Sequence, residues 1–261
     1  MLGVILKVIR MNKERYLELI EDRRKEHEMI ERLIRKKASN SEPIHILEAG
    51  CGRKWPFRLE RNQYILTGVD MDKDALEIRK NTLSDLHKTI EGDLCSVDLG
   101  ADKYDVIYSS FVLEHIKRAD LVMKNFVKWA KPNGIIIIKL PDPYSVRGYI
   151  TRITPHWFHV FYYRFIMRHK KAGKPGYGPY PTHYNPIVSR SGIRDFCNDG
   201  GNNILLDAEY GDGYFRPGRG FRKALIHIIK RVVSILSFGC LSDKHTNILY
   251  VLRKITPNET N

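Results

Sequence analysis

The pattern of apolar and polar residues predicts alternating strands and helices from residue 44 onward. Helical spacing of apolar residues predicts helices at Asp72–Lys80, Ala119–Ala130 and Ile187–Asn198. Short apolar runs predict strands at Ile44–Glu48, Tyr64–Asp70, Lys88–Glu91, Tyr104–Ser109, Ile135–Leu140, Asn203–Tyr210 and Asn247–Arg253. Because helices separate most of these strands, we expect parallel βαβ units in a doubly wound α/β sheet.

The same pattern divides the chain into segments. Residues 12–38 have a broken apolar stripe typical of a charged helix, so residues 1–40 are predicted to form an N-terminal helical extension. Residues 41–261 then form one domain. Its alternation lapses over residues 141–186 and 211–245, which are predicted to be helical insertions; excursions of this length from a compact core are usually functional.

The net charge of +14 is concentrated in these two insertions. Neither basic stretch, 147–174 or 213–231, contains an acidic residue, and the rest of the chain is close to neutral. The basic residues are Arg147, Arg152, Arg164, Arg168, Lys170, Lys171 and Lys174 in the first stretch, and Arg216, Arg219, Arg222, Lys223, Lys230 and Arg231 in the second.

The cysteines and the apolar runs bear on compartment and metal binding. Cys51, Cys95, Cys197 and Cys240 are scattered without the paired spacing of a metal site or a disulfide framework. Reduced thiols, no metal and a cytoplasmic location are therefore expected. No signal peptide is predicted at residues 1–11, and no run reaches the ~18 apolar residues of a membrane span.

One motif predicts a nucleoside site. The strand at Ile44–Glu48 ends in the glycine turn Gly50-Cys51-Gly52, where the backbone can approach a ligand closely. The next strand ends at Asp70, where a carboxylate is placed to accept hydrogen bonds from ribose hydroxyls. A dinucleotide fingerprint would need glycine where Trp55 stands, and Glu48 would repel a pyrophosphate but attract a ligand with an amino group.

Five segments in order then resemble the motifs of class I S-adenosylmethionine-dependent methyltransferases, most closely the type 11 group. They are E-A-G-C-G, G-V-D-M-D, E-G-D-L, Y-D-V-I-Y-S-S-F-V-L-E-H-I and K-P-N-G-I-I-I-I. The resemblance covers roughly residues 44–140, and more loosely 186–210 and 246–253. It implies a Rossmann-like doubly wound sheet of seven strands, mostly parallel with an antiparallel last strand, and S-adenosylmethionine as the cofactor.

The resemblance also implies roles for individual residues. Asp70 is implied to bind the ribose and Met71 to lie against the adenine. The full set implied to bind the cofactor is Glu48, Gly50, Gly52, Asp70, Met71, Asp93, Leu94, Ser109, Ser110 and Phe111. His115 lies in the family's L-E-H signature. Together with His183 it is our candidate for the catalytic general base, the alternative being that it only ties down the local helix.

The chain departs from the family pattern after the glycine turn. Lys54 replaces the third glycine, and only about ten residues, Pro56 among them, separate Gly52 from the next strand. The helix at this place is therefore predicted to be short or distorted. Pro141-Asp142-Pro143-Tyr144 follows the fifth strand and is interpreted as a turn into the first insertion, not as a base-binding motif.

The insertions leave three function hypotheses open. The first is a methyltransferase acting on a small-molecule, glycan- or lipid-linked acceptor, possible at an anionic membrane surface because residues 221–236 predict a basic amphipathic helix. The second is an RNA methyltransferase whose insertions hold nucleic acid; the wide apolar face makes nucleic acid the weaker partner hypothesis. The third is a non-catalytic cofactor-binding scaffold.

Overall fold

The structure is a computed structural model that describes residues 18–20, 23–38, 42–174, 176–200, 202–211 and 221–255. The predictions for residues 1–17, for Arg216 and Arg219, and for the side chains of Phe221–Lys223 and Leu225 lie outside this description. In the part described, no helix has the length and apolar character needed to cross a bilayer.

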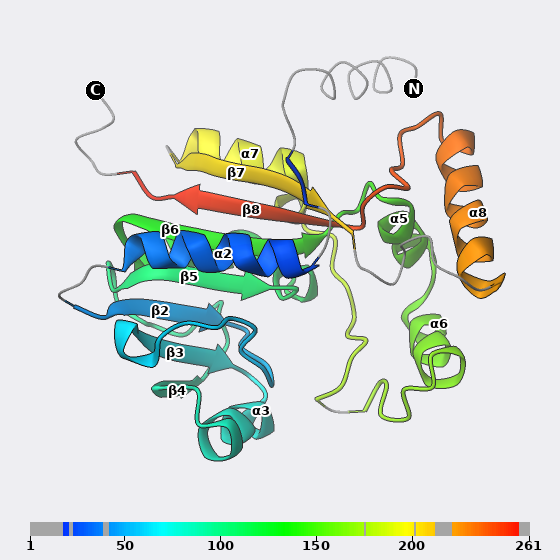
Figure 1. The fold of residues 1–261 in the computed structure, drawn as a ribbon. Helices are drawn as coiled ribbons and strands as arrows, with labels where there is room; N and C mark the ends of the chain where they lie inside the picture. The colour runs from blue at the N-terminus through cyan, green and yellow to red at the C-terminus, as the bar shows by residue number, and fades with distance from the viewer. Residues whose placement is uncertain are drawn as a thin grey trace.

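Within these ranges eight strands form one twisted sheet in the order β1-β7-β8-β6-β5-β2-β3-β4 (Figure 1). All neighbours pair in parallel except β8, which runs antiparallel to β6 and β7. The strands are β1 (Glu18–Ile20), β2 (Ile44–Ala49), β3 (Tyr64–Asp70), β4 (Lys88–Glu91), β5 (Tyr104–Ser110), β6 (Ala130–Pro141), β7 (Asn203–Tyr210) and β8 (Asn247–Arg253). The predicted mostly parallel seven-stranded sheet with its antiparallel last strand is confirmed, and β1 extends it at one edge.

Strand β1 corrects the prediction of one helix over residues 12–38. Glu18–Ile20 pair with Ala208–Tyr210 of β7, and the helix α2 is Arg23–Lys37. An apolar pair such as Leu19 and Ile20 fits a strand as well as a helix when only three residues are involved. The edge of β7 offers backbone hydrogen-bonding groups, and pairing with them favours the strand over the helix.

Local capping interactions help to set where the helices begin and end. Ser189 caps α7 by accepting a hydrogen bond from Gly192 N, so this helix begins three residues later than predicted. The predicted helix Asp72–Lys80 is shorter as an α-helix and continues as a π-helix. The elements are α3 (Lys73–Glu77), η2 (Ile78–Leu83), α4 (Ala119–Trp129), α5 (Val146–Ile153), α6 (His156–Phe161), η4 (Tyr162–Ile166), α7 (Arg190–Asp199), α8 (Phe221–Leu236), and the 3-10 turns η1 (Arg61–Gln63), η3 (Leu113–His115) and η5 (Pro186–Val188).

Both faces of the sheet are covered, which explains the uninterrupted apolar run of β6. Ile136 and Ile138 pack in the core under α4 and α7, together with Phe126 and Trp129. Ile135 and Ile137 point to the opposite core. That second core contains Ile30 and Ile34 of α2, Leu76 of α3, and Trp55 and Phe57 from the loop after β2.

The loop after β2 takes the place of a first helix. Residues 53–60 contain no helix, where the short spacing and Pro56 predicted one that is short or distorted. Trp55 and Phe57 fill this side instead, with ring centroids 5.0 Å apart in an edge-on arrangement, and both rings contact Tyr108 of β5. An aromatic cluster thus covers the sheet beside the glycine turn.

Candidate cofactor site

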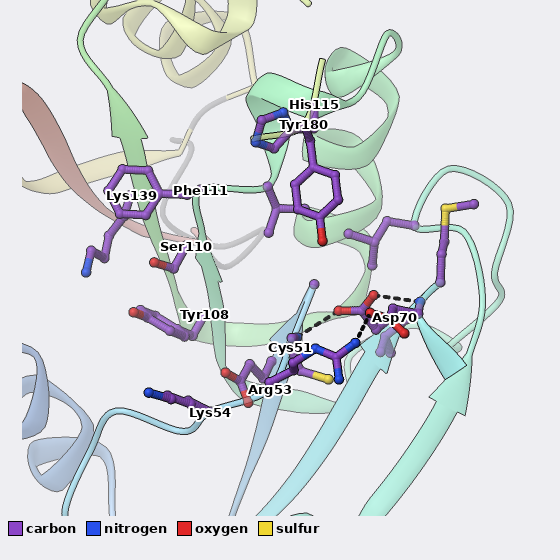
Figure 2. A pocket seen from close by; sticks show the side chains of 18 of the residues that line it. Cys51, Arg53, Lys54, Asp70, Tyr108, Ser110, Phe111, His115, Lys139 and Tyr180 are labelled. Atoms are coloured by element: carbon purple, nitrogen blue, oxygen red, sulfur yellow. Dashed lines mark hydrogen bonds and ion pairs between the residues drawn. The ribbon is translucent and has the colours of Figure 1, made fainter. Parts of the chain in front are cut away.

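A large pocket lies at the carboxyl ends of β2, β3, β4 and β5 (Figure 2). The strand order reverses between β2 and β5, and open α/β sheets bind ligands in the crevice at such a point. The pocket has a volume of about 840 Å³. This lies in the upper part of the range of roughly 300–1,000 Å³ for small-molecule sites, so a nucleoside cofactor leaves room for part of an acceptor.

The glycine turn forms one wall of the pocket, and two of its residues have left-handed backbones. Gly50 has φ of +70°, and a Cβ atom there would lie 2.4 Å from Val112 Cγ2. Gly52 has φ of +52° and faces open space, and its N–H donates to Asp70 Oδ2 at 2.8 Å. The turn is therefore a cradle that side chains would fill or strain.

Asp70 is held at the end of β3 by the turn that it faces. Its two carboxylate oxygens accept hydrogen bonds from Gly52 N and, at 2.9 Å, from Asp72 N. Asp72 in turn pairs with Arg53 at 3.0 Å (Figure 2). The strand-end carboxylate is thereby fixed before any ligand binds, and it lines the pocket as predicted.

Glu48 also lines the pocket, but its carboxylate has a protein partner that the sequence did not indicate. Arg79, fully buried in η2, lies 2.8 Å from Glu48 Oε2 and also contacts Asp85 and the carbonyl of Cys51. Burial raises the pKa of Glu48 to about 8, against the opposing effect of Arg79. Arg79 therefore fixes Glu48 under the glycine turn and offsets part of its charge.

The ends of β3 and β4 form the far end of the pocket. Met71 is 72% exposed at the rim, whereas Leu94 is buried in the pocket wall. Asp93 accepts a hydrogen bond from Cys95 N at 2.9 Å, which orders the turn after β4. Two apolar surfaces and one carboxylate suit a flat heterocycle with an exocyclic amine.

The end of β5 alternates between the pocket and the core. Tyr108 and Ser110 face the pocket, while Ser109 between them is buried and is not among the lining residues. A strand turns successive side chains to opposite faces, so the predicted Ser109 contact can only come from its backbone. Phe111 follows with φ of +57°, a strained conformation for a side-chain-bearing residue, and lines the pocket.

His115 lines the pocket together with Gly176 and Tyr180 from the segment 176–185. His115 Nδ1 donates to the carbonyl of Pro181 at 2.7 Å, because a carbonyl can only accept, so Nε2 is left as the acceptor. Burial lowers the pKa of His115, and the nearby His183 and His156 add to the effect. The imidazole is therefore neutral at pH 7.

His183 is not a lining residue, although it was predicted to be catalytic. Its backbone N–H donates to the carbonyl of Glu114 at 2.6 Å, which ties its segment to η3. Tyr180 reaches the pocket instead, with its ring 5.6 Å from that of His115. The Glu114 side chain is buried beside His115, and burial raises its pKa to about 8.

The most buried charged side chain that lines the pocket is that of Lys139, near the end of β6. It is 3% exposed, lies 2.6 Å from the buried Glu26 of α2, and faces the rings of Phe111 and Tyr210. A lysine within an apolar strand is a pattern that sequence analysis could have flagged. Among the lining residues that it missed are His27, Trp55, Tyr108, Lys139 and Tyr180.

Comparison with known proteins gives the family of this fold and pocket. Residues 20–191 match the family described as methyltransferase domain. The chain belongs to the class I S-adenosylmethionine-dependent methyltransferases. A solved S-adenosylmethionine-dependent methyltransferase from Mesorhizobium loti has the same fold, with a TM-score of 0.51 at 15% identity over 85% of this chain and 96% of that one.

Curated relatives resemble part of this chain. Malonyl-[acyl-carrier protein] O-methyltransferase of Halalkalibacterium halodurans is 27% identical over 130 residues, which are 46% of this chain and 48% of the relative. Ubiquinone biosynthesis O-methyltransferase of Coxiella burnetii is 28% identical over 94 residues, 34% of this chain and 40% of the relative. The chain thus spans about half the length or less of the curated relatives it matches.

Proposed function

We propose that this protein transfers a methyl group from S-adenosylmethionine to a small-molecule or lipid-linked acceptor. One observation carries the proposal: the glycine turn and the fixed carboxylate of Asp70 meet in one pocket at the switch point of a methyltransferase fold. By their names, the two curated relatives are O-methyltransferases, one acting on malonyl-[acyl-carrier protein] and one in ubiquinone biosynthesis, which supports an acceptor other than a nucleic acid.

The residues present fit this cofactor. Asp70 would accept hydrogen bonds from the ribose, and the backbone of Gly50 and Gly52 would lie against the methionine portion, where a Cβ at Gly50 would collide with Val112. Met71, Asp93 and Leu94 would hold the adenine. When bound, S-adenosylmethionine supplies a methyl group that its sulfonium charge has already activated.

The chain must then align and deprotonate the acceptor. His115 is neutral, its Nδ1 is engaged by Pro181, and its Nε2 is the acceptor site, so it would take a proton from an acceptor hydroxyl. Tyr108, Trp55 and Phe111 would exclude water from the remaining volume. Orientation in such a site contributes on the order of 7–11 kcal/mol in favourable cases.

The test is transfer of a labelled methyl group from S-adenosylmethionine into a cell extract divided into an organic and an aqueous fraction. We expect label in the organic or small-molecule fraction with the wild type, and at least about a hundredfold less with His115→Gln, the loss of a general base. Cofactor affinity should be unchanged in this variant. Binding without transfer into any fraction would favour the non-catalytic scaffold.

An RNA acceptor is the alternative that the basic insertions favour. It predicts that ribonuclease treatment of the extract removes the labelled product. Label that survives the nuclease and partitions into organic solvent would exclude it.

A further inference from the structure

The helices of the two insertions expose large apolar side chains. Among the large apolar side chains described in these insertions, the six most exposed are Ile153, Trp157 and Phe165 from the first insertion and Ile235, Leu236 and, just after α8, Phe238 from the second, with exposed fractions from 60% at Ile153 to 88% at Phe238. We call the exposed side of α5, α6, η4 and α8 the apolar helical surface. Soluble domains rarely gather so many large apolar groups in contact with water unless they bind something.

The two parts of this surface are joined. Helices α5 and α8 contact each other, and their flanking turns are bonded by Val146 N to Ser242 O at 2.9 Å and Ser242 N to Tyr144 O at 3.0 Å. Figure 1 shows α5, α6 and α8 together beyond the carboxyl ends of the parallel strands, the edge where the pocket lies. The first insertion then continues to Tyr180, which lines the pocket.

The charge around the surface has one sign. Between Asp142 and Asp195 the chain has no acidic residue, and none lies between 221 and 242. Lys170, Lys174 and Arg231 are exposed, while Lys230 is buried and does not belong to the surface. Exposed apolar and aromatic groups bordered by cations fit the boundary between lipid headgroups and acyl chains.

We propose that the apolar helical surface docks this protein on an anionic phospholipid bilayer, with α8 lying in the plane of the interface. The charge favours this occupant over a second copy of the chain, because a second copy would bring like charge against like. Docking there would present the pocket edge to the membrane. Docking requires no turnover, so its test is independent of the proposed methyl transfer.

The experiment is co-sedimentation of the full chain with vesicles of phosphatidylcholine alone or mixed with phosphatidylglycerol. We expect binding that rises with phosphatidylglycerol content and falls with salt. The variant Lys170→Glu/Lys174→Glu/Arg231→Glu should bind at least about a hundredfold more weakly, since each basic residue near a membrane contributes about a factor of five. The matched control Lys36→Glu/Lys80→Glu/Lys124→Glu carries the same charge change on exposed residues elsewhere.

A second pair of variants separates a membrane from a polyanion. Trp157→Ala/Phe165→Ala/Leu236→Ala should lose vesicle binding, whereas Leu83→Ala/Leu205→Ala, two exposed leucines away from the surface, should retain it. Circular dichroism and S-adenosylmethionine binding check that each variant is folded. Wild-type protein that ignores phosphatidylglycerol vesicles at low salt would overturn the proposal, as would apolar variants that bind them normally or self-association that the apolar variant abolishes.

Discussion

At the scale of single residues, the pocket depends on backbone that only glycine adopts without strain. Gly50 and Gly52 both have positive φ, but a Cβ at Gly50 would also meet Val112, whereas one at Gly52 would meet nothing within 4 Å. The two positions therefore separate conformational strain from steric overlap. Both residues are glycines of the same turn, so an alanine substitution at each can be compared directly.

We predict that Gly52→Ala lowers the free energy of unfolding by about 1–2 kcal/mol, the cost of a left-handed backbone. Gly50→Ala should cost about 2–5 kcal/mol, because overpacking adds roughly 1–3 kcal/mol. In the double variant Gly50→Ala/Val112→Ala, the steric part of the stability loss should be recovered and the backbone strain should remain. Urea unfolding of the wild type, the two glycine variants and the double variant measures these losses. Equal losses at the two glycines would contradict the contact with Val112.

Asp70 gives the second prediction at this scale. Asp70→Ala should weaken S-adenosylmethionine binding by about 1.5–3 kcal/mol, as expected for losing charge-assisted hydrogen bonds and the anchor of Gly52. Calorimetry measures it, and circular dichroism should show an intact fold. NAD should not bind to the wild type, since no helix follows the glycine turn to receive a pyrophosphate. Normal cofactor affinity in a folded variant would remove Asp70 from the ribose site.

At the scale of elements, one buried cluster of charges anchors the roots of both insertions. Asp142 follows β6, and His245 precedes β8; His245 Nε2 lies 2.6 Å from Asp142 and Nδ1 lies 2.8 Å from Glu209 at the end of β7. Arg190 of α7 contacts Glu209 at 2.7 Å. Asp142 therefore has a structural role, in agreement with its interpretation as part of a turn and not of a base-binding motif.

This cluster predicts a pH dependence of stability. Burial opposes the charge on His245, but its hydrogen bonds to Asp142 and Glu209 prevail and raise its pKa above 6.5. Its contribution is complete below this value and is lost as pH rises through the raised pKa. The pKa values of Asp142 and Glu209 are lowered from 3.8 and 4.5 despite burial, so their contribution is lost as pH falls.

The stability that this cluster contributes should therefore be highest between about pH 5 and pH 6.5 and decline on both sides. Scanning calorimetry across this range measures it. The difference in melting temperature between the wild type and His245→Gln should be largest near pH 6, with the wild type more stable, and should shrink as pH rises. A variant with the wild-type alkaline decline would assign that titration to other groups.

At the scale of the whole molecule, the first insertion and the sheet meet over the pocket. The segment 176–185 is held to η3 by His183 N to Glu114 O and by His115 Nδ1 to Pro181 O. Tyr180 from this segment and Gly52 from the turn after β2 line the same pocket, although 127 residues lie between them in the sequence. Ligand binding must therefore couple the insertion to the glycine turn.

We predict that S-adenosylmethionine slows amide hydrogen exchange in residues 50–54 and 176–185. At an S-adenosylmethionine concentration of 100 times its dissociation constant, local openings of the protein that release the cofactor should become about 2.7 kcal/mol less favourable. Helix α8 serves as the internal control, because its local openings do not touch the pocket. Protection at the glycine turn alone would show that the segment 176–185 does not sense the cofactor.

Local patterns in the chain are enough to predict the sheet, the glycine turn and the strand-end carboxylate. Apolar runs, alternation and a glycine pair beside an acid are local patterns, and each is dictated by backbone geometry within a few residues. Tyr64–Asp70, Lys88–Glu91 and Asn247–Arg253 form strands with the predicted bounds. Most of the predicted cofactor residues line one pocket because parallel strands end at one edge.

The remote side chains that complete that pocket are brought there by the packing of the folded chain. Lys139 pairs with Glu26 of a helix more than a hundred residues earlier, and Arg79 holds Glu48 from across β3. His183 and Ser109 were placed at the site by position along the chain, but neither lines the pocket: Ser109 is buried, and the His183 backbone is bonded to Glu114. Such contacts depend on how segments pack, and no local pattern records them, because the same periodicity is compatible with several partners.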